Sequence, residues 1–159
     1  MSSSCAVVER RPAEPRDAGL LRQLVGESRA DLALLPAELV DLQVDAQRRQ
    51  YDADFPLARY EILTVDGVDV GRLVVDVSGP AVRVVDVVVS PAHRRRGIAR
   101  AVLGEVVAAA HQDGRAVALS VWADDAAAVA LYAGLGFTAA GRDDVRIELE
   151  HHPEQEDIA

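Results

Sequence analysis

The stretch that decides the fold is Val-Val-Val-Ser-Pro-Ala-His-Arg-Arg-Arg-Gly-Ile-Ala at residues 87–99. A run of valines ends at Val89, and apolar residues with helical spacing begin at Ile98. The first amides of a helix lack intrahelical partners and carry the positive end of the helix dipole. Gly97 leaves the backbone open at that point, and three consecutive arginines precede it. The stretch therefore predicts an anion-binding site between a strand and a helix, with an exposed basic loop as the alternative.

The charge of the chain is divided unevenly. Its 159 residues hold 26 acidic and 17 basic side chains, a net charge of −9, and every basic side chain is arginine. Residues 83–100 contain five arginines and one aspartate, a net of +4, so the remainder holds 12 bases and 25 acids, a net of −13. A chain this acidic is a poor candidate for binding nucleic acid or an anionic membrane over its whole surface. We expect an anionic ligand at the basic segment and a cationic partner elsewhere.

Outward from this stretch, the periodicity predicts one α+β domain over residues 1–159, with a core at about 6–150 and a polar tail at 151–159. The expected sheet is mixed and mostly antiparallel, with about seven strands and about four flanking helices. Its last meander strand, Val82 to Val89, is expected to be buried on both faces. The helices are expected after a cap at Asp17, from Pro36 to about Gln50, from Gly97 to Gly114, and from a cap at Asp124 or Asp125 to Gly134.

Several classes of protein are disfavoured by the sequence. No apolar run approaches the roughly 18 residues that a membrane-spanning helix needs. Cys5 is the one cysteine, so an internal disulfide is impossible and a cysteine-based zinc site is not expected. The paired histidines at 151–152 have no matching ligand pair, so no metal is expected. The first residues do not read as a signal peptide, which makes a cytoplasmic location the expectation.

At the basic segment the sequence resembles the GNAT superfamily of acyl-CoA-dependent N-acetyltransferases. The family signature is Arg or Gln, two residues, Gly, one residue, then Gly or Ala. The segment Arg94-Arg95-Arg96-Gly97-Ile98-Ala99 fits that signature and follows a family-like Val-Ser-Pro at residues 89–91. A second family pattern, Asn-x-x-Ala-x-x-Leu-Tyr followed by Gly-Phe, is matched by Asp125, Ala128, Leu131-Tyr132 and Gly136-Phe137. The order of elements agrees too, so the resemblance covers about residues 6–150.

This resemblance implies acetyl-CoA as co-substrate. The segment Arg94, Arg95, Arg96, Gly97, Ile98 and Ala99 would hold the pyrophosphate of the cofactor. The backbone of Val87, Val88 and Val89, splayed from the next strand, would pair with the pantetheine arm. Asp125 stands in a cofactor-binding position where the family usually has Asn. It can cap a helix equally well, but an ionised carboxylate cannot donate a hydrogen bond.

The implied catalytic residues are Tyr132 and Asp86. The resemblance places Tyr132 near the thioester sulfur as general acid for the departing thiolate, and plain core packing is the alternative. The two places where family members carry a basic carboxylate hold Ser120 and Arg83 here. Asp86 is our candidate general base, with Glu61 and a chain of waters as alternatives. Asp86 could equally be a structural aspartate bonded to the backbone.

These features together predict an enzyme. It would move an acetyl group from acetyl-CoA to a primary amine of a small molecule or peptide, preferably a cationic one. Attack would be direct within a ternary complex, because no placed Ser or Cys nucleophile is visible. A non-catalytic acyl-CoA-binding sensor or partner module of the same fold is the first alternative. A nucleotide-binding protein is the second, although the chain lacks a P-loop and any Gly-x-Gly-x-x-Gly. A homodimer is compatible with the sequence.

Overall fold

The computed structural model describes residues 7–28 and 34–154, which form one seven-stranded sheet with four α-helices. This confirms the α+β class. Cys5 and the end of the predicted tail, residues 155–159, lie outside the described residues. The strands are β1 (Val8–Pro12), β2 (Arg59–Val65), β3 (Val68–Asp76), β4 (Val82–Val89), β5 (Val117–Trp122), β6 (Thr138–Arg142) and β7 (Arg146–His151). The helices are α1 (Ala18–Ser28), α2 (Ala37–Asp54), α3 (Ile98–Gln112) and α4 (Ala126–Gly134), with short 3-10 turns η1 (Pro15–Asp17) and η2 (Pro91–His93).

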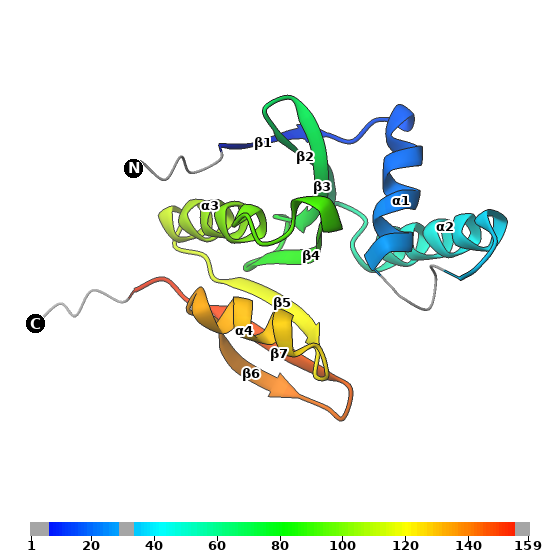
Figure 1. Cartoon of the computed structure of the whole chain (residues 1–159). Helices are drawn as coiled ribbons and strands as arrows, with labels where there is room; N and C mark the ends of the chain where they lie inside the picture. The colour runs from blue at the N-terminus through cyan, green and yellow to red at the C-terminus, as the bar shows by residue number, and fades with distance from the viewer. Residues whose placement is uncertain (1–6, 29–33, 155–159) are drawn as a thin grey trace, which may run out of the picture.

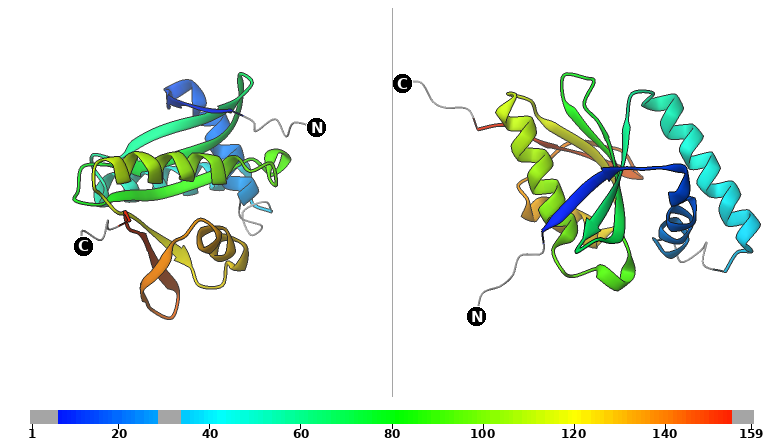
Figure 2. Two further views of the ribbon diagram at one scale, coloured as in Figure 1. Left: turned by 90° about the vertical axis from the view of Figure 1, so that its left-hand side faces the viewer. Right: turned by 90° about the horizontal axis from the view of Figure 1, so that it is seen from above.

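The sheet consists of two antiparallel parts joined by one parallel pair. Its strand order is β1-β2-β3-β4-β5-β7-β6, and β4 and β5 are the parallel neighbours. The helix α3 supplies the crossover between them, as a parallel connection requires. Figure 1 shows β1 to β4 as one part of the sheet and β5, β7 and β6 as the other. Seen from above in Figure 2, α3 lies on one side of the sheet and the pair α1 and α2 lies on the other.

Each face of the sheet has its own apolar layer. The layer under α3 joins the inward face of that helix to alternate residues of the strands, including Val102, Leu103, Leu73 and Val117. The opposite layer is smaller, and it lies where α1 packs on β3 and β4. Its buried side chains are Leu24, Val25, Ile62 and Val74. The strands therefore alternate between the two layers, which fixes the face on which each polar residue lies.

Three features differ from the sequence expectations. Asp17 does not cap α1; it ends η1, and its carboxylate accepts hydrogen bonds from Arg11 and from the Glu14 amide. The strand β4 is buried only at Val82 and Val84, and the rest of it is half-exposed. The tail starts later than predicted, because His151 is the last residue of β7 and its ring packs against Phe137. The partial burial of β4 results from its separation from β5, which is described below.

Candidate active site

The two central strands part after three residues. The parallel pairing of β4 with β5 covers Val82, Arg83 and Val84 and then stops. At that point the register between β3 and β4 shifts, because Val75 faces Val84 whereas Val74 faces Asp86. The extra residue is Val85, which forms a β-bulge that bends the strand. Residues 85–89 of β4 consequently stay paired with β3 but have no strand beside them on the β5 side.

The helix start after this strand is rich in unpaired amides. The first backbone bond of α3 runs from the Ala101 N–H to the Gly97 carbonyl, at 2.9 Å. Among the described residues, no acceptor faces the backbone amides from Arg95 to Arg100. Gly97 has φ +75°, a left-handed conformation that favours glycine, and Arg95 also has a positive φ of 64°. A Cβ on Gly97 would meet no atom within 4 Å, so the space before the helix is open. Unpaired amides beside open space at a helix start have the geometry that suits an anion.

The side chains of this segment divide into exposed and inward-facing ones. Arg95 and Arg96 are exposed and have no ion-pair partner in the described part of the chain. Arg94 folds back and donates from Nε to the Val89 carbonyl, at 3.2 Å. That carbonyl is therefore not free, contrary to the expectation for the whole of residues 87–89. Ile98 is buried in the α3 layer, so only its backbone is available to a ligand.

Tyr132 lies in α4 and is 9% exposed. Its ring meets Phe137 edge-on with the ring centres 5.6 Å apart, but its hydroxyl makes no hydrogen bond to the described residues. Burial, with the charges of Asp86 and Asp125, raises the pKa of Tyr132 to about 12. The phenol therefore stays protonated at neutral pH. The charge of Asp86, on β4, is thus one of those that favour the protonated phenol.

Asp125 caps α4, as one of the two predicted candidates. Its Oδ1 accepts a hydrogen bond from the Ala128 amide, at 3.1 Å. This bond fixes the start of the short helix that carries Tyr132. The described residues show no second partner for this exposed carboxylate. The capping role is thus present, and a role toward a cofactor stays a prediction.

Asp86 is held by a buried arginine rather than by the backbone. Its Oδ2 forms an ion pair with Arg72 of β3, which is 4% exposed and also donates to Gln47 of α2, at 3.1 Å. Tyr51 of α2 lies close by: burial raises the pKa of its hydroxyl, and the charge of Asp86 and a hydrogen bond with it add to this effect. Sequence reasoning missed Arg72 and Tyr51. The signal for Arg72 was a charge in the middle of an apolar strand, with Asp86 of opposite charge in the middle of the next strand.

Ser120 and Arg83, the two places where family members carry a basic carboxylate, both lie beside the carboxylate of Glu148. Arg83 forms an ion pair with Glu148 of β7, and Glu148 is the cross-strand neighbour of Ser120. Ser120 itself accepts from Arg146, at 3.4 Å. The alternative base Glu61 does not join this group. It pairs with Arg10 at 3.5 Å, on the α3 face that it shares with its cross-strand partner Leu73.

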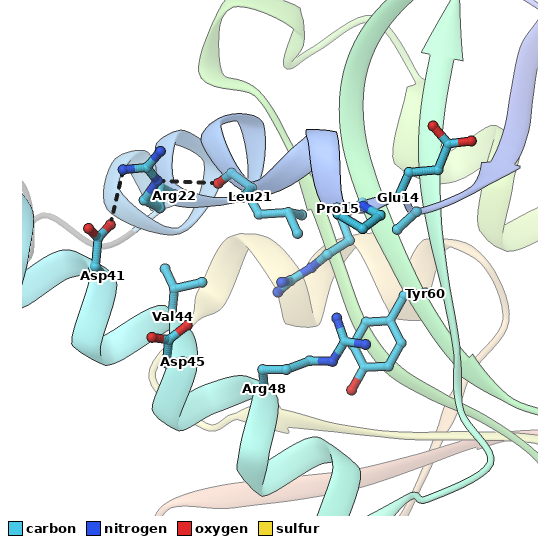
Figure 3. A pocket seen from close by; sticks show the side chains of 12 residues that line it. Glu14, Pro15, Leu21, Arg22, Asp41, Val44, Asp45, Arg48 and Tyr60 are labelled. Atoms are coloured by element: carbon cyan, nitrogen blue, oxygen red, sulfur yellow. Dashed lines mark hydrogen bonds and ion pairs between the residues drawn. The ribbon is translucent and has the colours of Figure 1, made fainter.

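Beside this group a pocket of about 480 Å³ lies between α1, α2 and the sheet (Figure 3). Three carboxylates line it, those of Glu14, Asp41 and Asp45. Arg72 also lines it and connects it to Asp86. Two further arginines in the wall are already paired, Arg22 with Asp41 and Arg48 with Asp52, each at 3.4 Å. Asp45 has no ionic partner among the described residues.

The described residues contain no group of three or more His, Cys, Asp or Glu side chains that could hold a metal ion. None of the described helices is long and apolar enough to span a membrane. The site therefore consists of a strand opening, an amide-rich helix start, a buried phenol and a paired carboxylate.

Comparison with protein families agrees with this geometry. The model of the acetyltransferase (GNAT) family matches residues 34–137, which is more than half of the chain. The match includes β4, the start of α3 and all of α4. Members of this family use acetyl-CoA. None of the curated proteins compared with the chain matches it.

Solved structures share the whole fold at low sequence identity. An acetyltransferase from Thermus thermophilus is 21% identical with a TM-score of 0.71, and the match covers 93% of this chain and 98% of that one. The PaiA N-acetyltransferase of Thermoplasma acidophilum, in complex with coenzyme A, is 13% identical with a TM-score of 0.70, covering 92% and 99%. The ribosomal-protein-S18-alanine N-acetyltransferase of Escherichia coli is 19% identical with a TM-score of 0.67, covering 96% and 99%. At these identities the likeness establishes the fold.

Proposed function

Because this chain belongs to the acetyltransferase (GNAT) family, we propose that it transfers an acetyl group from acetyl-CoA to a primary amine of a small molecule or peptide. The amine attacks directly in a ternary complex. The observation that carries this proposal is the set of unpaired amides from Arg95 to Arg100, next to a strand that has lost its neighbour. Together they offer an anion site and a backbone edge, the two elements needed to hold a phosphorylated, amide-containing cofactor.

The cofactor follows the strand opening. Its pyrophosphate lies on the amides at Gly97, Ile98 and Ala99, with Arg95 and Arg96 adding charge. Its amide-containing arm pairs with the free side of β4 near Val87 and Val88. Arg94 releases the Val89 carbonyl if the arm is to pair along all three valines. This arrangement brings the thioester to the gap between β4, which carries Asp86, and β5, which leads into α4 with Tyr132.

The reaction then needs two proton movements. The amine nitrogen forms a bond to the thioester carbon, and strand amides near Val88 stabilise the oxyanion. Asp86 accepts the proton that the nitrogen loses, directly or through water. As the carbon–sulfur bond breaks, the thiolate takes a proton from the Tyr132 hydroxyl, which has no competing hydrogen bond among the described residues. The products are the N-acetylated amine and free coenzyme A.

The acceptor class follows from the pocket between α1 and α2. Two of its three acids are paired with arginines, Asp41 with Arg22 and Glu14 with Arg16. The free carboxylate of the third, Asp45, favours a cationic group beside it. Arg72 connects this pocket with Asp86, so an acceptor can place one amine near the gap and a second positive group near Asp45. We therefore propose a cationic amine as acceptor.

One observation favours a second candidate function. The Asp86 carboxylate is already paired with Arg72, and Arg83 occupies one of the two usual carboxylate places. A non-catalytic acyl-CoA-binding module of the same fold would tolerate both features. Such a module would bind the cofactor equally well and would acetylate no amine.

One experiment separates these functions. The purified chain is incubated with acetyl-CoA and a panel of diamines, amino acids, arylamines and peptide N-termini, and the released thiol is measured. Calorimetry with acetyl-CoA, ATP and NAD runs in parallel. Thiol release that depends on one amine class supports the enzyme. Tight acetyl-CoA binding without thiol release supports the binding module, and preference for ATP or NAD would contradict both.

A further inference from the structure

The helix α2 is attached to the molecule along one face only. None of the residues in this 18-residue helix is buried. Its inner face is half-buried and consists of Val40, Val44, Gln47 and Tyr51. Figure 2 shows α2 along the outer side of the molecule. Apolar packing on its exposed face would add to the stability of such a helix.

The outer side of α2 carries an apolar stripe. Leu39, Leu42 and Ala46 follow one another at spacings of three and four residues, which places them on one side of the helix. We call this set the leucine stripe. Leu39 and Leu42 are 44% and 60% exposed, and Ala46 is exposed as well. Nothing in the described residues covers the stripe.

Among the described residues, two unpaired charges of α2, one near each end, lie beside the leucine stripe, and the unpaired Asp45 between them lines the pocket with α1. Glu38 lies near the start of α2 and Arg49 near its end, and neither forms an ion pair within the described part of the chain. Their separation of 11 residues is three helical turns, so both lie on the same flank of the stripe. The flank is acidic at one end and basic at the other. A second helix that ran in the same direction would place Glu38 beside Glu38 and Arg49 beside Arg49.

We propose that α2 is the interface between two copies of this chain, packed antiparallel about a two-fold axis. A two-fold axis brings the same flank of both helices together with reversed direction. Glu38 of one copy then faces Arg49 of the other, and the pair occurs twice. Leu42 lies next to the axis and packs against Leu42 and Ala46 of the second copy. Leu39 covers Ala46 and the stem of Arg49.

The expected association is moderate. One pair of helices buries less surface than the standard interface of ~1,600 Å². The dimer should therefore dissociate on dilution, with a Kd on the order of micromolar. The proposal stands independently of the enzymatic one, because it uses no residue of the strand opening or of α3 and α4.

Sedimentation equilibrium on the full chain tests the interface. The unaltered protein should pass from monomer to dimer as its concentration rises through the micromolar range. Leu42→Glu should keep it monomeric over that range. Leu57→Glu is the matched control, because Leu57 is 68% exposed but lies outside the leucine stripe, and it should leave the dimer intact. Far-UV circular dichroism confirms that both variants fold.

A charge exchange tests the direction of packing. Arg49→Glu and Glu38→Arg should each weaken the dimer at least tenfold, because like charges then face each other. The double variant restores both pairs and should regain most of the affinity. A protein that is monomeric at all concentrations would overturn the proposal. So would a dimer that Leu42→Glu leaves unchanged, or a double variant as weak as the single ones.

Discussion

The side chain of Tyr132 has two separable parts, a ring that packs in the core and a hydroxyl that we propose as proton donor. The ring packs edge-on against Phe137, whereas the hydroxyl has no hydrogen bond among the described residues. Tyr132→Phe keeps the packing and removes only the proton donor. We expect kcat to fall by about 10- to 10³-fold, with little change in acetyl-CoA affinity or in Tm. Steady-state kinetics, calorimetry and thermal unfolding measure the three quantities.

The pKa of about 12 adds a pH test for the same residue. A raised pKa keeps the phenol protonated, so the unaltered enzyme should lose no activity through Tyr132 below about pH 11. An unchanged kcat in the Phe variant would make Tyr132 a packing residue. A variant that unfolds would make its hydroxyl part of the fold.

Asp86 is tested best against its ion-pair partner. Asp86→Asn should lower kcat/KM roughly 10²-fold near neutral pH, and the loss should shrink as pH rises, because more of the amine is then already neutral. The change also leaves the buried Arg72 without a counter-charge, which costs on the order of 3 kcal/mol of stability. Arg72→Gln removes the same ion pair and keeps the carboxylate. Equal losses of kcat/KM in two folded variants would show that the pair only supports the fold.

Among the secondary-structure elements, the turn η1 contributes to the free energy of unfolding in a way that depends on pH. Asp17 accepts from Arg11 at 2.7 and 2.9 Å and from the Glu14 amide at 2.7 Å. The Arg11 guanidinium, helped by that amide, lowers the pKa of Asp17 from 3.8 to about 2. Because the folded-state pKa is below the unfolded one, this stabilisation is complete above pH 3.8 and is lost as pH falls through about 2.

Asp17→Asn should therefore cost roughly 2 kcal/mol at neutral pH and much less near pH 2. Urea unfolding of both proteins at several pH values measures the difference. Glu9→Gln, an exposed acid in β1 without a partner among the described residues, is the control and should change little. A difference that stays constant across this pH range would contradict the role of the ion pair.

The helix α3 begins at a glycine in a left-handed conformation, and the space beside its unpaired amides is open to an anion. Gly97→Glu should abolish acetyl-CoA binding, because the carboxylate enters the space before the free amides. Gly97→Gln has the same strain at φ +75° and similar bulk without the charge, so it should bind more tightly than the Glu variant. Calorimetry on both folded variants decides the matter. An unaltered affinity in the Glu variant would refute the phosphate site.

Elements with a strong period or a strong turn signal were predictable, and elements shaped by long-range pairing were not. The meander, α3 and the cap at Asp125 follow from local patterns and were confirmed. The prediction that β4 is buried on both faces was wrong. Its valines are typical of a central strand, but after the bulge at Val85 the second half of β4 no longer pairs with β5. No local sequence pattern predicts the residue at which the pairing of two parallel strands ends. The pairing of Asp86 with Arg72 lies across two strands and was missed for the same reason.

At the scale of the whole molecule, the uneven distribution of charge determines which ligands are attracted to each part of the surface. The basic loop before α3 faces an anionic cofactor, and the free carboxylate of Asp45 lies in the pocket between α1 and α2. The net charge of −9 therefore attracts a cationic acceptor over long distances, although it repels the cofactor everywhere except at the basic loop. Opposite responses to salt should follow for molecules of opposite charge.

Salt tests this division with the acetyl-CoA concentration kept saturating, so that only the acceptor responds. Raising the ionic strength from about 0.02 to 0.3 M shortens the screening length to well under 10 Å, so kcat/KM for a dicationic amine should fall several-fold. A neutral amine of similar size should show little change. Asp45→Asn should weaken the salt dependence for the dication, because it removes the unpaired carboxylate from the pocket. An acceptor whose kcat/KM rises with salt would show that the pocket does not select a positive charge.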